Sequence, residues 1–437
     1  MVDFADSQSR PIAENQFPEV PRELPVTGTF ATIGCRKTKP MKTTLILTAC
    51  LLALPAFAEE SADVKPIVTG NTAFALELYG QLRTQEGNLF LSPYSISTAL
   101  AMTYGGARGA TEKQMAKTLH FGLPQEQLHL GFAALQSRLN AVQQKGKIKL
   151  AIANSLWPHK GYDFLPAYLD LCQKQYGVAI TPVDFNNATE SARKTINDWV
   201  ENKTNRKIQE LFKPGILDAR TRLVLANAIY FKGTWTEQFD KKLTRKQPFH
   251  LTTDKTTTAP LMHRQGRYRY AEYPTLQVLE LPYAGNDLSM IVLLPVSHKE
   301  LEAIEAKWSA DRLAGWLKQL HPVEVDVYLP QFKMASQFSL NQTLAALGMT
   351  DAFTVKADFS GMDGQQDLFI SAVIHKAFVE VNEEGTEAAA ATGVAMEMKS
   401  EPAEPVVFRA DRPFLFLIRD NPTGSLLFLG RVTDPTK

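Results

Sequence analysis

The sequence predicts an α+β fold built on large, mixed β-sheets. Helical apolar spacing dominates the first part of the chain, residues 222–231 form a nearly continuous apolar run, and two late apolar segments flank a turn sequence. A continuous apolar run is typical of a strand that is covered on both faces. Helices concentrated early and strands concentrated late indicate α and β layers packed around a shared core.

The early helices are predicted by apolar spacing and by the residues at their ends. Apolar residues recur at helical spacing in 69–83, and residues 95–104 form a compact apolar helix that ends before a Gly-Gly pair. Another helix is expected to begin at Thr111, because Gln114 follows three residues later in a capping-box pattern. Residues 190–204 are predicted to form a further helix.

Strands are predicted mainly in the later half of the chain. Residues 288–294 are apolar on both faces, whereas apolar and polar residues alternate in 323–328 and in 375–382, which is typical of half-exposed strands. Residues 414–418 and 426–429 are apolar and are separated by an Asn-Pro-Thr-Gly turn sequence. These segments supply enough strands for extended sheets.

Composition and motifs argue against several functional classes. The 437 residues are 44% hydrophobic and 21% charged, with a formal net charge of +1, whereas a nucleic-acid binder would show a basic excess or stripe. The short cluster Lys145, Lys147 and Lys149 is interpreted as a solvated turn. The sequence has no Gly-x-Ser-x-Gly elbow, phosphate loop or His-Glu-x-x-His motif, and its eight histidines lack metal-ligand spacing. We therefore expect no enzyme activity, no cofactor and no metal site.

The N-terminal region carries the pattern of an export signal. Met41 and Lys42 open an apolar run over 45–54, which is followed by the small-residue cleavage pattern Ala-Phe-Ala that ends at Ala58. The run is too short to span a membrane. We predict that residues 1–40 are an upstream extension with no structural role, that 41–58 are a signal peptide, and that the protein is secreted to the extracellular space or the periplasm.

One alternative for this region stays open. The sequence Leu-Thr-Ala-Cys at 47–50 resembles a bacterial lipobox, in which Cys50 would be lipidated and would hold the protein at a membrane. Ordinary cleavage after Ala58 would instead remove both Cys35 and Cys50. Cys172 would then be the one remaining cysteine, so no internal disulfide could form. The fold would have to rest on the core that about 380 residues can bury.

Residues 383–400 carry the strongest functional signal. Their alanine content permits a helix, and a mobile surface loop is a second simple interpretation. At period two, one set of side chains is uncharged and small to apolar: Thr386, Ala388, Ala390, Thr392, Val394 and Met396. The other set carries Glu387 and Glu397. The segment therefore suits two states, an exposed loop and a strand with one buried face.

Here the sequence resembles the serpin family of serine protease inhibitors, from about Thr69 to Pro435. The resemblance rests on separated motifs that occur in the family's order and at its spacing. They are NLFLSPYS at 88–95, GGARGAT at 105–111, LANAIYFKGTW at 225–235, HKA at 375–377, the hinge at 383–392, DRPFLF at 411–416 and GRV at 430–432. Each motif alone is weak evidence, but all of them together are specific.

The resemblance implies a single serpin domain over 59–437, with three β-sheets, about nine helices and an exposed reactive-centre loop at about 383–405. It also implies a monomer that acts as a suicide substrate. The serine of a protease would attack the loop and form an acyl-enzyme. The cleaved loop would then insert into the main sheet as a new strand and would carry the protease with it.

The same resemblance assigns the reactive residues. Counting along the family hinge from Glu383 places the reactive bond at Lys399–Ser400, and a lysine there suits a trypsin-like protease. Met398 and Met396 are secondary cleavage candidates for chymotrypsin- or elastase-like enzymes, and a cysteine protease is a further class of partner left open. The hinge, from which Thr386 and the residues after it would enter the sheet, is Glu383, Glu384, Gly385, Thr386, Glu387, Ala388, Ala389, Ala390, Ala391 and Thr392.

Two further regions are assigned by resemblance, the shutter under the central strands and the breach at the top of the sheet. Four residues match the shutter: Ser92, Ser95, Asn227 and His375. Their polar groups are equally compatible with routine hydrogen bonding in a core. Trp235, Gln331 and Glu383 match the breach. Relatives often have a lysine where this chain has Gln331, so Lys333 or a neutral hydrogen bond is expected to replace an ion pair with Glu383.

The main alternative function is that of a non-inhibitory serpin, such as a carrier, chaperone or storage protein. Such members tend to have a charged or bulky residue in the hinge, so Thr386 and the run Ala388–Ala391 favour inhibition. The sequence therefore predicts an irreversible inhibitor of trypsin-like serine proteases. No nucleic-acid partner is expected, and no membrane partner unless Cys50 is lipidated.

Overall fold

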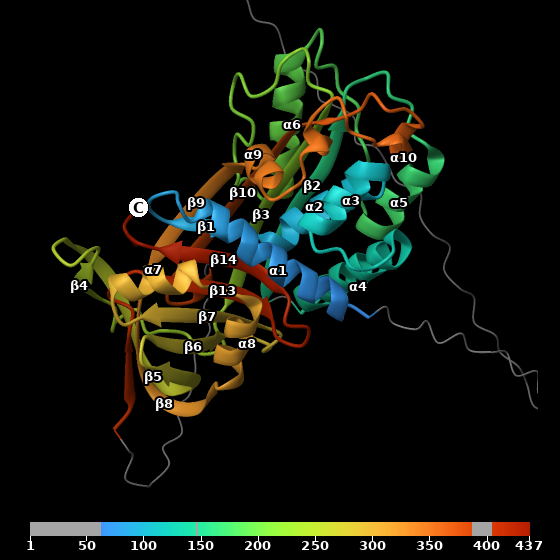
Figure 1. The fold of residues 1–437 in the computed structure, drawn as a ribbon. Helices are drawn as coiled ribbons and strands as arrows, with labels where there is room; N and C mark the ends of the chain where they lie inside the picture. Colours follow the sequence, from blue (N-terminus) through green and yellow to red (C-terminus); the bar gives the residue numbers. More distant parts are fainter. Residues whose placement is uncertain (1–62, 146, 387–403) are drawn as a thin grey trace, which may run out of the picture. The chain divides into compact units, whose positions relative to one another are not determined.

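Ten α-helices and fourteen β-strands make up the part of the chain that the structure describes, which covers residues 63–145, 147–386 and 404–437 of a computed structural model (Figure 1). The helices are α1 (Lys65–Leu82), α2 (Pro93–Tyr104), α3 (Gly109–Thr118), α4 (Gln125–Gln144), α5 (Pro166–Tyr176), α6 (Thr189–Lys203), α7 (His298–Ala306), α8 (Ala310–Lys318), α9 (Asn341–Ala346) and α10 (Ser360–Asp363), with a 3₁₀ turn η1 (Asp351–Phe353). The strands are β1 (Leu89–Leu91), β2 (Ile148–Pro158), β3 (Leu223–Thr234), β4 (Arg245–His250), β5 (Thr256–Tyr273), β6 (Leu276–Pro282), β7 (Leu288–Pro295), β8 (His321–Pro330), β9 (Phe332–Ser339), β10 (Ile370–Val381), β11 (Gly385–Thr386), β12 (Val406–Arg409), β13 (Phe414–Asp420) and β14 (Leu426–Val432). The predicted signal peptide, Cys50, the hinge from Glu387 to Thr392, and Met396, Met398, Lys399 and Ser400 lie outside the described residues.

The strands of the described residues form two hydrogen-bonded sheets, where the sequence predicted three. A five-stranded sheet has the order β11-β3-β10-β9, and β2 also pairs with β3. A nine-stranded sheet has the order β1-β14-β13-β7-β6-β5-β8-β12, and β4 also pairs with β5. The long strand β5 pairs with β4, β8 and β6, so its hydrogen bonds join strands that would otherwise belong to separate sheets.

The five-stranded sheet lies between two hydrophobic cores. Along β3, Leu225 and Ile229 face the larger core, to which α1, α2 and α4 contribute, whereas Ala226 and Tyr230 face a smaller core built with α6. Both faces of β3 are therefore covered, which explains why its sequence is apolar at nearly every position. Asn227 is the exception, and it lies on the face toward α2.

The helix ends show where local sequence signals held and where they did not. At the start of α2, the Ser92 hydroxyl accepts a hydrogen bond from the Ser95 backbone N–H (3.2 Å), and Pro93 occupies the first turn. The capping box predicted at Thr111 is wrong, because α3 begins two residues earlier, at Gly109. The Thr111 hydroxyl instead accepts a hydrogen bond from the backbone N–H of Asp358 (2.9 Å).

Residues 60–437 form one compact unit. Within residues 63–145, 147–386 and 404–437, no helix is both long and apolar enough to cross a membrane, and no group of three or more His, Cys, Asp or Glu side chains could hold a metal ion. Cys172 is buried, and burial raises the pKa of its thiol to about 12. The thiol is therefore a small packing group rather than a nucleophile.

The centre of the five-stranded sheet is a parallel pair that does not run the full length of its strands. β10 pairs with β3 from Ile370 to Phe378, opposite Leu223 to Tyr230. The pairing between β3 and β10 ends at Tyr230 and Phe378. Beyond this point β10 continues to Val381 against β9, and β3 continues to Gly233 against β2. The last residues of β3, Gly233 and Thr234, pair with β11 instead.

Candidate functional site

A row of polar residues crosses the middle of the five-stranded sheet. Asn227 on β3 lies opposite Asn154 on β2 and opposite His375 on β10, so the three side chains share one face. Asn227 donates to the Ser95 carbonyl oxygen (2.9 Å) and hydroxyl (2.8 Å) at the start of α2, and its side chain is also hydrogen-bonded to Asn154 and to His375. The four predicted shutter residues thus meet here, with Asn154 as a fifth member.

The ring of His375 links β10 to the N-terminus of α2. The backbone N–H of Ser92 donates to Nε2 of His375 (3.1 Å), so this nitrogen is an acceptor and the proton of a neutral ring lies on Nδ1. The Nδ1 atom then donates to Oδ1 of Asn227. The Ser92 hydroxyl donates to the Leu427 carbonyl oxygen of β14 (2.6 Å), so the cluster also reaches the nine-stranded sheet.

Burial keeps this histidine neutral. His375 is fully buried, and desolvation lowers its pKa from 6.5 to about 3. An unfolded chain would take up a proton near pH 6.5, whereas the folded chain would not until about pH 3. The free energy of unfolding must therefore fall as the pH drops below 6.5, by about 1 kcal/mol per pH unit from this group.

Replacing His375 with glutamine is expected to reduce that pH dependence. Glutamine keeps one donor and one acceptor but does not titrate, so the His375→Gln protein should lose less stability than the unsubstituted protein between pH 6.5 and pH 4. Denaturant midpoints of unfolding at each pH would measure this. His321→Gln, at an exposed histidine, is the control for the substitution itself. Equal slopes for all three proteins would show that His375 is not the titrating group.

The predicted breach residues meet at the turn that follows β10, at residues 382–385. The carboxylate of Glu383 is buried and accepts hydrogen bonds from the Gln331 amide (2.7 Å) and from the Thr244 hydroxyl (2.6 Å). Lys333 lies 3.9 Å from Glu380 instead, on the outside of the sheet. Glu383 is therefore held by neutral donors, and the neighbouring Glu384 pairs with Lys241.

Trp235 holds the same turn from the end of β3. Its indole N–H donates to the carbonyl oxygen of Asn382 (3.0 Å), and its backbone N–H donates to that of Glu384 (3.0 Å). The indole is stacked on the ring of Tyr283, with centroids 4.6 Å apart and planes 10° apart. The hydroxyl of Tyr283 is in turn hydrogen-bonded to that of Thr386 (3.0 Å). Trp235, Tyr283 and Thr386 therefore form one buried layer.

The turn reverses the chain and starts a new strand beside β3. Asn382 and Gly385 exchange backbone hydrogen bonds (2.8 and 3.1 Å), and Gly385 and Thr386 then pair antiparallel with Thr234 and Gly233. Since β2 already occupies the other edge of β3 at Gly233, β11 must lie on the edge that faces β10. Thr386 is fully buried there.

Gly385 is required by its backbone conformation and by its surroundings. Its φ is +141°, in the region that side chains disfavour. A Cβ atom at this position would lie 2.1 Å from the carbonyl oxygen of Gly233. Only glycine can therefore bring the chain this close to β3.

Sequence reasoning missed three contributors to these clusters. On β2, every second side chain is apolar and faces the core, as at Leu150, Ile152 and Leu156. Asn154 is the polar exception in this series, and that exception was the available signal for a buried polar contact. Thr244 and Tyr283 gave no signal, because they reach Glu383 and Thr386 from segments distant in sequence. The described hinge residues Glu383 to Thr386 all lie at the turn and in β11.

The comparison with known proteins identifies the family. The model of the family described as "Serpin (serine protease inhibitor)" matches residues 69–435, which is most of the chain. This chain belongs to the serpin family. As a member of a protease-inhibitor family, the serpin is not an enzyme.

Relatives of this serpin include the leukocyte elastase inhibitors. Those of Sus scrofa and Homo sapiens are each 45% identical to it, over 85% of this chain and 100% of their own. Among solved structures, uncleaved ovalbumin is 31% identical with a TM-score of 0.76, and the match covers 84% of this chain and 100% of that one. Serpin48 of the insect Tenebrio molitor is 32% identical with a TM-score of 0.75, over 84% and 97% of the two chains.

Proposed function

We propose that this serpin irreversibly inhibits a trypsin-like serine protease, which cleaves it at Lys399–Ser400. The protease serine attacks the carbonyl carbon of Lys399, the Ser400 amine leaves, and the ester that forms joins the loop to the protease. The segment from Thr386 onward then enters the five-stranded sheet between β3 and β10. The protease is carried along and is distorted before water can hydrolyse the ester.

The observation that carries the proposal is the position of Thr386. It lies fully buried beside β3, at the end where β3 and β10 are no longer paired with each other. Each residue that follows it into this space would extend β11 and would separate β3 from β10 further. The small side chains at Ala388 and Ala390 could pass between the strands, because the alternating positions of a strand share one face.

The free energy available from such insertion is large enough to damage a protease. Thr386 to Lys399 is 14 residues, or roughly 45 Å of strand at about 3.3 Å per residue. The parallel β3–β10 pairing would be lost, but the new strand would be antiparallel to both neighbours and would form two ladders. A net gain of on the order of ten hydrogen bonds gives roughly 10 kcal/mol. This matches the stability of a typical domain, about 5–15 kcal/mol.

The identity of the target rests on the residue before the cleaved bond. The pocket of a trypsin-like protease ends in a carboxylate that would pair with Lys399. The relatives are named as inhibitors of leukocyte elastase, so an elastase-like protease is the second target class, and Met398 or Met396 would then be the cleavage point.

Lys399→Glu separates these targets. The substitution is expected to abolish the detergent-stable complex with trypsin, because glutamate would meet a like charge in the pocket, while the fold stays intact. Lys399→Arg is the matched control and should keep trapping trypsin. Gel electrophoresis after boiling in detergent measures the complex. Undiminished trapping of trypsin by Lys399→Glu would show that another bond is the reactive one.

A non-inhibitory role as a carrier, chaperone or storage protein is the alternative on the same fold. Trypsin would then cleave the loop without becoming trapped. Mass spectrometry of the mixture distinguishes the two functions, because an inhibitor yields a covalent complex together with a peptide that begins at Ser400.

We further propose that the protein is exported and that residues 41–58 are removed as its signal peptide. The pattern that supports this is the apolar run before Ala58. The mass of the protein purified from its native source would give an N-terminus at Glu59. A lipid attached to Cys50, or a retained segment 41–58, would contradict it.

A further inference from the structure

A pocket lined by three arginines opens on the nine-stranded sheet. Its volume is about 350 Å³, and β5, β6, β7 and β13 contribute to its walls. The lining residues that matter here are Arg267, Arg269, Glu280, Ser289, Arg419 and Asn421. Such a volume suits a small organic molecule rather than one or two waters.

Strand register places these side chains on one face of the sheet. Ser289 of β7 lies opposite Arg419 of β13, and Glu280 of β6 lies opposite Arg269 of β5. Asn421, two residues beyond Arg419, donates its side-chain N–H to the Ser289 hydroxyl (2.7 Å). Arg419, Ser289 and Asn421 therefore form one wall of the pocket.

The positive charge of the pocket exceeds its negative charge. Glu280 forms an ion pair with Arg269 (3.2 Å), so this carboxylate is already engaged. Arg267 has no ion pair among the described residues. The Nε atom of Arg419 is buried and has no hydrogen-bond partner in the part of the chain that the structure describes. An unpaired buried N–H of a guanidinium is costly unless a ligand accepts from it.

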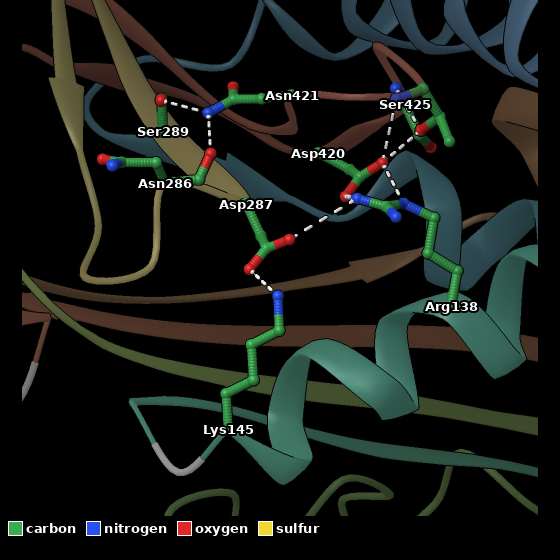
Figure 2. A network of polar contacts seen from close by, with 9 residues as sticks. Arg138, Lys145, Asn286, Asp287, Ser289, Asp420, Asn421 and Ser425 are labelled. Carbon is green, nitrogen blue, oxygen red and sulfur yellow. Dashed lines mark hydrogen bonds and ion pairs between the residues drawn. The ribbon is translucent and has the colours of Figure 1, made fainter.

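Asp420 and Asp287, each next in sequence to a residue that lines the pocket, are already bound by other cations (Figure 2). Asp420 is next to Arg419 in sequence but is fully buried, and Arg138 of α4 binds it with two hydrogen bonds of 2.9 Å. Asp287 is paired with Lys145 (2.6 Å), just beyond the end of α4. Both carboxylates thus have a cationic partner on α4 or just beyond its end, and burial lowers the pKa of Arg419 from its ordinary value.

We propose that this pocket is a binding site for a small organic phosphate, with Arg419 and Arg267 as the residues that bind the phosphate group. Guanidinium groups match the oxygens of phosphate and bind them through pairs of N–H donors. The organic part would fill the remaining volume beside Pro282. The proposal is independent of the inhibitory function, because the hinge is not part of the pocket.

Isothermal titration calorimetry of the full chain with phenyl phosphate, in a phosphate-free buffer, tests this site. We expect saturable binding of one molecule per chain that weakens as sodium chloride is added, and no binding of the neutral benzyl alcohol. Arg419→Gln and Arg267→Gln should each weaken the affinity at least tenfold. Because Arg267 is exposed, its variant is expected to fold and can test the site even if the Arg419 variant does not fold.

Arg220→Gln is the matched control, because Arg220 is an exposed arginine outside the pocket. It should bind phenyl phosphate as the unsubstituted protein does. Equal affinity in all four proteins, or no saturable binding, would overturn the site. Inorganic phosphate should bind more weakly, since it leaves most of the pocket empty, and equal affinity for both compounds would overturn the organic phosphate.

Discussion

Thr386→Arg is expected to turn the protein from an inhibitor of trypsin into a substrate. Thr386 is fully buried between Tyr283 and the end of β3, and a guanidinium there would have no partner. Burial of an unpaired charge costs several kcal/mol. This cost disfavours both the formation of β11 and the insertion of the residues that follow it. Acyl-enzyme would then be hydrolysed before insertion, and the yield of detergent-stable complex should fall at least tenfold while cleavage at Lys399 continues.

Thr386→Val is the control for this experiment. Valine keeps the size and branching of threonine and loses only the hydrogen bond to the Tyr283 hydroxyl (3.0 Å). It should keep most of the trapping activity, because the buried side chain stays small and uncharged. If Thr386→Arg formed as much complex as Thr386→Val, entry of the hinge would not be needed for inhibition.

Cleavage of the loop is expected to raise the melting temperature on the order of 10 °C or more. The estimate follows from roughly 10 kcal/mol of new hydrogen bonding. Unfolding entropy is about 2 cal/mol/K per residue, so a chain of this length gains on the order of 1 °C for each kcal/mol. The measurement is calorimetry of the native protein and of protein nicked at Lys399.

The cleaved Thr386→Arg protein provides the comparison, because its loop is cut but its hinge is blocked. It should melt close to the uncleaved form. Equal melting temperatures of the native and nicked unsubstituted proteins would show that the uncleaved state is not metastable.

The sequence predicted those strands that are buried on both faces, because such strands are apolar at nearly every position. β3, β7, β13 and β14 were predicted because their residues are apolar at nearly every position. β5 was not, since Pro260, Gly266 and exposed arginines interrupt its pattern. Its pairing with β4, β6 and β8 is a tertiary property, which is why the number of sheets could not be predicted correctly.

In the candidate site, too, some features were predicted from sequence motifs and others depend on tertiary packing. His375, Asn227 and Ser95 were found because they stand in recognisable motifs, and the structure brings them into one hydrogen-bonded cluster. The hydrogen bond between Gln331 and Glu383 was one of two expected arrangements, and only the packing of the turn distinguishes it from a pair with Lys333.

Hydrogen exchange at residues 388–397 of the nicked protein measures most directly whether the loop becomes a central strand. If insertion drives inhibition, amide protons there should exchange as slowly as those of β3 and β10 on either side. Exchange at the rate of an unstructured peptide, in a molecule cut at Lys399, would contradict the proposed mechanism.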